Sequence, residues 1–161
     1  MVTCSAATLT QIVADIDDPE LPHVTIGDLG IVRDVRVDGT VATVVLTPTY
    51  TGCPATEQIR DDVIDVVRLA GYEPRVELTL SPAWTTDWIT ERGRQRLAEA
   101  GISPPGPTRR VDAATVVDLP VPCPRCGSRR TRLVSVFGST ACKAAHVCEA
   151  CREPFDAFKA L

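Results

Sequence analysis

The sequence predicts an α+β fold followed by a small metal-binding unit, and three observations support this prediction. Helical and strand-like patterns of apolar residues occur in the order helix, strand, strand, helix, strand, helix. A stretch rich in proline, with few large apolar side chains, comes next, and two C-x-x-C pairs follow it. We therefore expect an α+β domain over 1–101, a partly extended linker over 102–121 and a separate unit over 122–161.

The first three elements are expected to be a helix and a β-hairpin. Apolar residues at positions i, i+3, i+4 and i+7 predict a helix over 8–17. Alternation predicts a strand over 31–37, and a nearly continuous apolar run over 41–46 predicts a second strand in the centre of its sheet. Asp38-Gly39 between the two strands is a strong hairpin signal. An antiparallel pair therefore begins the sheet.

The next three elements are expected to be a crossover helix, a third strand and a last helix. A loop of turn-forming residues over 47–54 leads into a helix over 54–69, which has an apolar stripe on one side. Alternation predicts a third strand over 75–80, and helical spacing with a mixed face predicts a helix over 86–100. A strand that follows a crossover helix usually returns to the same sheet.

Composition limits the class of protein. The chain has 161 residues, of which 44% are hydrophobic and 4% aromatic, so a modest aliphatic core is expected. No apolar run approaches the ~20 residues that cross a bilayer, so no membrane association is expected. The first residues show no secretory signal, so the cytosol, and hence a cytoplasmic location, is the expected compartment.

The charge is distributed unevenly along the chain. Residues 1–120 carry a net charge of −8 and residues 121–161 one of +4, which four thiolates on a divalent ion would lower to +2. A solvated surface is the ordinary explanation of such an excess. Nucleic-acid binding through the arginines of the tail is a distant alternative.

Four cysteines have the spacing of a metal site. The pairs Cys123/Cys126 and Cys148/Cys151 are separated by 21 residues. Each pair can form a tight turn that directs backbone N–H groups at sulfur, and four sulfurs in a tetrahedron suit Zn²⁺. A tail with few large apolar residues needs such a staple to fold. We predict a closed, structural zinc site; a single iron in the same cage, as in rubredoxin-type electron carriers, is the alternative.

Cys53 is the candidate reactive thiol. It lies at the expected start of the 54–69 helix, where unpaired N–H groups and the helix dipole favour a thiolate. Such a thiol could attack a substrate, bind a soft metal or hold an iron–sulfur cluster transiently; a small buried packing residue is the alternative. Asp18, Glu20 and Asp28 precede the first strand and could face the same site as ligands of iron, although loop acids are more often solvated.

The remaining candidate residues form no catalytic pattern. Cys142 lies between the two pairs in a segment typical of a tight turn, either at a partner surface or as a packing residue. His23 and His146 are the only histidines, and nothing resembles a phosphate-binding glycine loop. Because a full acid–base constellation is absent, a binding or assembly module is favoured over an enzyme.

Two resemblances to known families follow from the motifs. Residues from about 8 to 100 resemble the MIP18-like domain, which is associated with iron–sulfur cluster assembly, through Asp18-Pro19-Glu20, Asp28-Leu29-Gly30, Leu46-Thr47 and Thr51-Gly52-Cys53-Pro54. The domain and the tail together resemble the D-subunit family of the bacterial phenylacetyl-CoA epoxidase (phenylacetate-CoA oxygenase) system. That closer match rests on four segments, 81–88, 123–128, 137–144 and 153–159.

The resemblance implies an accessory role in aerobic phenylacetate degradation. In that family the diiron oxygenase and the reductase are separate subunits, and the D-subunit proteins assist the assembly of an iron or iron–sulfur centre in one of them. By position, Cys53 would be the reactive or cluster-holding thiol, and the four tail cysteines would hold zinc in a zinc-ribbon-like unit. The partners implied are the oxygenase and reductase subunits, with a homodimer left open. The alternatives are a direct thiol-dependent component of the epoxidase complex and a rubredoxin-like electron carrier.

Overall fold

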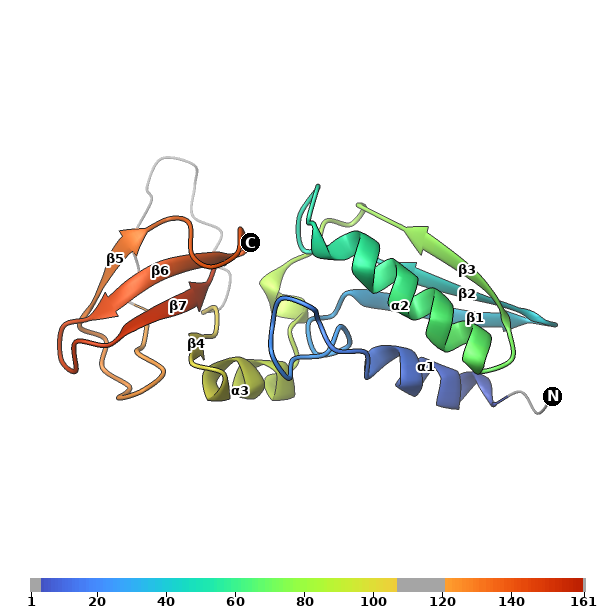
Figure 1. The fold of residues 1–161 in the computed structure, drawn as a ribbon, viewed down its shortest axis with the longest axis horizontal. Helices are drawn as coiled ribbons and strands as arrows, with labels where there is room; N and C mark the ends of the chain where they lie inside the picture. The colour runs from blue at the N-terminus through green and yellow to red at the C-terminus, as the bar shows by residue number, and fades with distance from the viewer. Residues whose placement is uncertain (1–3, 107–120, 161) are drawn as a thin grey trace. The chain divides into compact units, whose positions relative to one another are not determined.

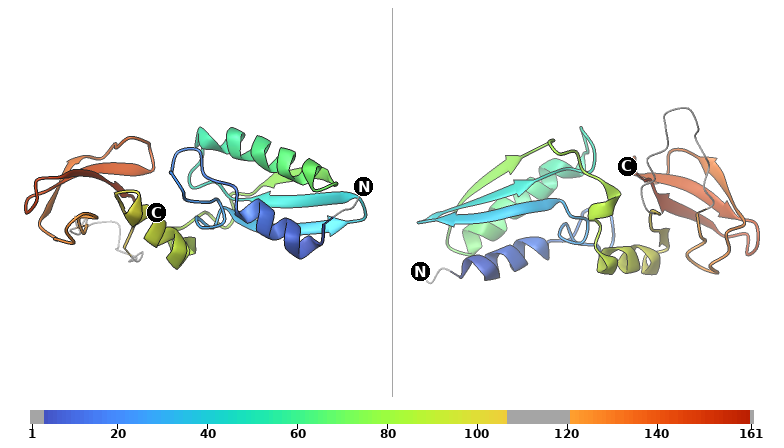
Figure 2. Two further views of the ribbon diagram at one scale, coloured as in Figure 1. Left: turned by 60° about the horizontal axis from the view of Figure 1, so that its bottom comes forward. Right: turned by 180° about the vertical axis from the view of Figure 1, so that it is seen from behind.

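The computed structural model describes residues 4–106 and 121–160. The chain divides into two compact units (Figures 1 and 2). The first unit comprises Met1–Trp84 and Trp88–Gly93, and the second comprises Thr85–Asp87 and Arg94–Leu161. Both units combine helices with sheet or extended chain, so the α+β class expected from the sequence is confirmed.

The first unit is built on a three-stranded sheet in the order β1-β2-β3. Strands β1 and β2 pair antiparallel, and β2 pairs parallel with β3. The hairpin, the central position of the second strand and the crossover helix are therefore as predicted. The elements are α1 (Ala6–Ala14), β1 (Val32–Asp38), β2 (Val41–Leu46), α2 (Ala55–Leu69) and β3 (Glu73–Leu78).

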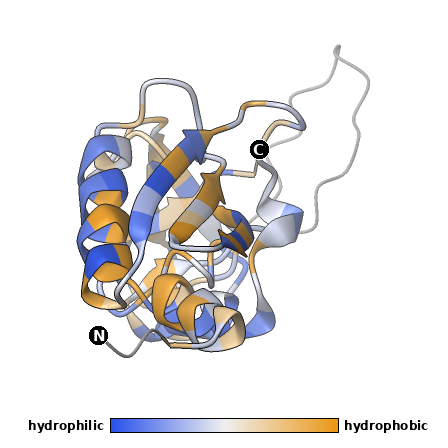
Figure 3. Cartoon of the chain, turned by 90° about the vertical axis from the view of Figure 1, so that its right-hand side faces the viewer, coloured by the Kyte–Doolittle hydropathy of each residue, from blue (hydrophilic) through white to orange (hydrophobic). Residues whose placement is uncertain are grey.

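Helices α1 and α2 pack on this sheet (Figure 1). Burial alternates along β2, where Val44 and Leu46 are buried and their neighbours are partly exposed. Polar and apolar residues are mixed along α2 (Figure 3), and its buried side chains include Val63 and Val67. Burying one stripe of a helix against one face of a sheet removes the largest apolar area from water. The Ser5 hydroxyl caps α1 by accepting the backbone N–H of Thr8 at 3.2 Å.

The irregular segment between α1 and β1 is well packed although it forms no regular element. The backbone N–H of Ile26 donates to the carbonyl of Ile16 at 2.8 Å, and Asp17 forms an isolated antiparallel bridge with Thr25. Gly27 lies so close to the end of α1 that a Cβ there would stand 2.6 Å from the Ala14 carbonyl oxygen. These contacts fix the loop that carries Asp18, Glu20 and Asp28.

The second unit contains a four-stranded sheet in the order β4-β7-β6-β5. Strand β6 pairs antiparallel with both β5 and β7, whereas β4 pairs parallel with β7. The strands are β4 (Ile102–Ser103), β5 (Thr131–Ser135), β6 (Lys143–Cys148) and β7 (Pro154–Phe158).

The helix predicted over 86–100 is interrupted. It consists of a 3₁₀ turn η1 (Thr86–Trp88) and a helix α3 (Glu91–Glu99). The break lies at Thr90, whose hydroxyl accepts the backbone N–H of Gly93 at 3.0 Å and so caps the start of α3. Among the described residues, no helix is long and apolar enough to cross a membrane.

The predicted linker begins with a strand. Ile102–Ser103 forms β4, and the Ser103 hydroxyl donates to the Pro122 carbonyl at 2.8 Å. These two residues pair with β7, which lies about 50 residues further along the chain, and no local sequence pattern indicates such a pairing. Most of the predicted linker, 107–120, lies outside the described residues.

Candidate functional site

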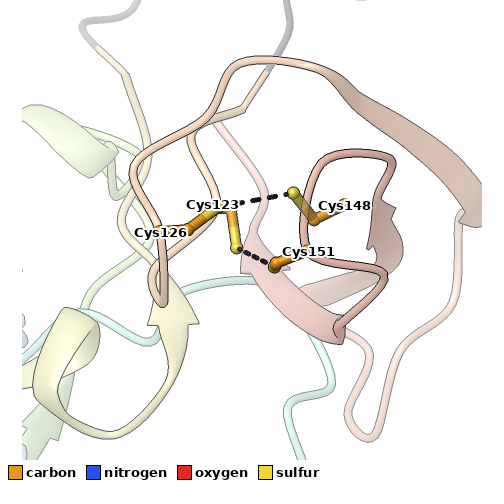
Figure 4. A group of neighbouring side chains, drawn as sticks. All are labelled: Cys123, Cys126, Cys148 and Cys151. Carbon is orange, nitrogen blue, oxygen red and sulfur yellow. Dashed lines mark hydrogen bonds between the residues drawn. The ribbon is translucent and has the colours of Figure 1, made fainter.

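The four cysteines of the two C-x-x-C pairs converge in the second unit (Figure 4). Their Sγ atoms all lie within 4.8 Å of one another, with Cys123 and Cys151 at 3.8 Å and Cys126 and Cys148 at 3.6 Å. A tetrahedron of sulfurs ~2.3 Å from a central ion has edges of about 3.8 Å. The sulfur positions therefore fit a single tetrahedral metal ion such as Zn²⁺.

The two turns that carry these cysteines share one backbone pattern. The N–H of Gly127 donates to the carbonyl of Cys123 at 2.9 Å, and the N–H of Arg152 donates to the carbonyl of Cys148 at 2.8 Å. Gly127 and Arg152 both have positive φ, 71° and 64°. Because the left-handed region favours glycine, Arg152 adopts it at a cost that the closed turn offsets. Each turn therefore presents its two sulfurs to the same point.

The thiols need a cation before all four can ionise. The backbone N–H of Cys151, opposed by burial and assisted by the N–H of Ala150, lowers the pKa of Cys148 to about 6. The N–H of Glu153 acts to lower the pKa of Cys151, but desolvation and the three neighbouring thiols raise it to about 12. A divalent ion removes this conflict, because it stabilises all four thiolates together.

Cys142 and His146 belong to the packing of the second unit rather than to this cluster. Cys142 is buried just before β6, with Sγ 3.0 Å from the Thr140 hydroxyl oxygen. His146 is buried in β6 and stacks on Phe155 with ring centroids 5.6 Å apart. Across the described residues, no other group of three His, Cys, Asp or Glu side chains lies close enough to share an ion.

Cys53 lies in the first unit, two residues before the start of α2 at Ala55. Gly52, with φ 84°, turns the chain so that Cys53 precedes Pro54 and the first turn of the helix. The side chain is partly exposed and lines a pocket together with Asp18. The other lining residues are mostly apolar. They come from β2, α2 and β3 and from the loops before β1 and after β2: Ile31, Leu46, Pro48, Thr49, Thr56, Ile59 and Leu78.

The size of this pocket restricts what it can hold. Its free volume is about 20 Å³, which is room for little more than one water molecule. A metal ion fits such a space. The space beside Cys53 and Asp18 is therefore large enough for an ion or a small inorganic ligand.

Of the three loop acids predicted to face Cys53, Asp18 lines the pocket and the other two do not. Asp18 is nearly buried, and its Oδ1 accepts the backbone N–H of Glu20 at 2.8 Å. That bond fixes the orientation of the carboxylate. Glu20 itself is partly exposed and does not line the pocket.

Asp28 serves a different purpose. Its carboxylate has no exposed surface, and Oδ1 accepts hydrogen bonds from Arg92 Nε at 2.7 Å and from the Thr90 hydroxyl at 3.1 Å. Burial acts to raise the pKa of Asp28, but the bonds from Arg92, the Thr25 N–H and Thr90 outweigh it and hold the pKa below its usual value. Asp28 therefore joins the first loop to the start of α3.

The comparisons with known proteins match both parts of the chain. Residues 7–78 match the family model of the iron–sulfur cluster assembly protein, and residues 107–159 match that of the PaaD zinc beta ribbon domain. A curated relative from Escherichia coli K12 is 48% identical over 153 residues, which cover 93% of this chain and 90% of the relative. Its name describes it as the D subunit of a "Putative 1,2-phenylacetyl-CoA epoxidase".

Two solved structures share the fold of the first part. A domain of unknown function (DUF59) from Bacillus anthracis has a TM-score of 0.53 at 30% identity, covering 57% of this chain and 90% of that one. A conserved hypothetical protein from Thermotoga maritima has a TM-score of 0.50 at 24% identity, covering 60% of this chain and 98% of that one. The resemblance seen in the sequence motifs is confirmed, and the chain belongs to the D-subunit family of phenylacetyl-CoA epoxidase, with an iron–sulfur-assembly-type domain followed by a PaaD zinc ribbon.

Proposed function

We propose that this chain is an accessory component of a phenylacetyl-CoA epoxidase system in aerobic phenylacetate degradation. In this proposal it acts in the cytoplasm and assists the assembly of an iron or iron–sulfur centre in the oxygenase or the reductase. The name of the E. coli relative supports the system, and the iron–sulfur assembly model over 7–78 supports the chemistry. The observation that carries the proposal is the pocket that Cys53 and Asp18 share.

The donor set of this pocket suits iron as a transient cargo. A thiolate and a carboxylate together bind divalent iron, and the rest of the lining is mostly apolar. Two protein ligands leave most coordination positions open. The ligands of a recipient protein can fill those positions one by one, so the ion can leave without first becoming free. A site meant to retain its metal would supply three or four protein ligands.

The ribbon metal is assigned a structural role in this proposal. Four sulfurs complete a tetrahedron and leave no position for a substrate, and the second unit has a small apolar core around Cys123, Cys148 and Phe155. Zn²⁺, when bound there by the four cysteines, supplies the cross-link that stabilises this unit. Iron in the same cage would instead make the chain an electron carrier.

The test is iron loading and delivery by the full-length chain under anaerobic conditions. Purified protein is supplied with Fe²⁺, with and without sulfide, and mixed with metal-free oxygenase or reductase. Cys53→Ser should lower iron bound beyond the ribbon metal at least tenfold and abolish recovery of partner activity. Cys4→Ser removes the other lone, partly exposed thiol of the same unit and should behave as wild type. Equal iron binding and equal partner recovery by Cys53→Ser would refute the proposal.

The same system separates an assembly role from a direct one. Oxygenase and reductase that already contain their metal centres should turn over at full rate without this chain. A requirement for the chain at that stage would instead make it a working component of the epoxidase complex.

A further inference from the structure

The outer strand of the second unit's sheet carries exposed apolar side chains beside a basic one. Arg132, Val134 and Val136 alternate along β5 and its continuation, and Phe137 follows them. Val134, Val136 and Phe137 are 58%, 55% and 71% exposed. Strand β5 is outermost in the order β4-β7-β6-β5, and within the described residues no strand pairs with its other edge. We call these four residues the β5 stripe.

The charge around the β5 stripe is positive, and most of it has no ion-pair partner among the described residues. Arg129, Arg130 and Arg132 are all exposed. A fourth arginine close to them in sequence, Arg125, forms an ion pair with Glu153 at 2.8 Å. No carboxylate of the described residues forms an ion pair with the other three arginines. A surface of this kind attracts a partner that presents acidic groups.

We propose that the β5 stripe is the surface through which this chain docks on the protein that receives its iron, and that the recipient presents carboxylates around an apolar patch. This inference rests on the proposed function. The apolar residues favour a protein over a nucleic acid, because a phosphate backbone would leave Val134, Val136 and Phe137 uncovered.

Side chains rather than backbone make this contact. The register of β5 against β6 shifts between Leu133 and Ser135, and such a bulge interrupts the regular spacing of N–H and C=O groups at the edge. An added strand would therefore pair poorly. The exposed side chains of Arg132 and the two valines instead offer a surface that a partner can cover.

Phe137 is the anchor of the stripe because it is the largest and most exposed of the apolar side chains there. Its N–H donates to the Ser135 hydroxyl at 3.1 Å, and the Lys159 ammonium lies 5.0 Å from the centre of its ring. An aromatic side chain has only two rotatable bonds, so it loses little conformational entropy on binding. Aromatic and arginine side chains are also the residues that most often dominate the affinity of an interface.

The test measures binding of the full-length, metal-containing chain to the purified oxygenase and to the purified reductase, at low and high salt. Phe137→Ser should raise Kd at least tenfold, chiefly through faster dissociation. Arg132→Glu should slow association and weaken its salt dependence, because charged rims steer encounter. Leu69→Ser removes a comparably exposed apolar side chain from the first unit and should leave Kd unchanged. Retained metal content and circular dichroism show that each variant is folded.

Several outcomes would overturn the docking inference. These are equal affinity of the β5 stripe variants and wild type, absence of binding to either protein, or a stripe that mediates only self-association or binding to DNA. Cys53→Ser should dock as wild type does. If docking depends on the stripe while Cys53→Ser still delivers iron, the docking surface stands and the proposed role of Cys53 fails.

Discussion

Arg92 Nε donates a 2.7 Å hydrogen bond to Oδ1 of Asp28, a carboxylate with no exposed surface. A half-exposed guanidinium thus compensates a fully buried negative charge. Removing the cation would leave that charge in an environment with little solvent. Of the ion pairs described in the first unit, this pair should therefore contribute most to the free energy of unfolding.

Arg92→Gln should lower the free energy of unfolding by about 2 kcal/mol, because Asp28 would lose its charged donor while remaining buried. The matched control is Arg36→Gln, which removes an exposed pair with Asp34 and should change stability by less than about 1 kcal/mol. Urea denaturation of both variants measures the difference. Equal losses would contradict the role assigned to Asp28.

The same carboxylate should make the first unit acid-sensitive. Its pKa lies below the ordinary value of 3.8, since the bonds that it accepts outweigh the effect of burial. A lowered pKa in the folded state means that the contribution of Asp28 is complete above the unfolded value and is lost as pH falls through the folded one. Asp28→Asn should therefore flatten the fall of Tm below about pH 4. An unchanged acid profile would count against this account.

Removal of the ribbon metal should unfold the second unit. Metal analysis of the isolated chain should give one zinc and no visible absorbance, whereas iron in the four-sulfur cage would absorb strongly. Cys126→Ser should weaken metal binding by about 100-fold or more, because a ligand is lost from a four-thiolate set. Cys142→Ser should keep the metal, since Cys142 stands outside the group. Circular dichroism before and after treatment with a strong chelator should show the loss of structure in the second unit.

Two glycines with positive φ should respond very differently to alanine. At Gly30, with φ 69°, a Cβ would stand 2.6 Å from the carbonyl oxygen of Trp88; at Gly39, with φ 58°, it would meet nothing within 4 Å. Gly30→Ala should cost about 3 kcal/mol, from backbone strain and a steric clash, and Gly39→Ala about 1 kcal/mol, from strain alone. Thermal unfolding compares the two, and similar costs would contradict the close packing at Gly30.

Local sequence patterns were sufficient to predict the helices and strands of the first unit. Alternation and helical spacing are properties of adjacent residues, and the Asp38-Gly39 turn fixes the register of the hairpin. They did not separate η1 from α3, because the cap at Thr90 depends on one hydroxyl rather than on periodicity. Nor did they find β4, since a strand of two residues has no measurable period.

The candidate sites divide in the same way. The spacing of the two C-x-x-C pairs was sufficient to predict the cysteine cluster. Each pair forms a local turn, and a single metal ion needs the sulfurs of two such turns. The three acids of the first loop were indistinguishable in sequence. Only tertiary packing separates Asp18, beside Cys53, from Asp28, which Arg92 engages. The signal available for Asp28 would have been Arg92 itself, but a partner 64 residues away has no local signature.

Because Ile102 pairs with Asp156, the sheet of the second unit can be completed only after residue 156 has been synthesised. Strand β4 leaves the exit tunnel first and has no neighbour until β7 has been made, and Cys148 and Cys151 emerge shortly before it. Contacts so far apart in sequence close late. The nascent chain can therefore form its first sheet before Cys148 and Cys151 have been synthesised, and the four-sulfur site can close only after residue 151 has been added.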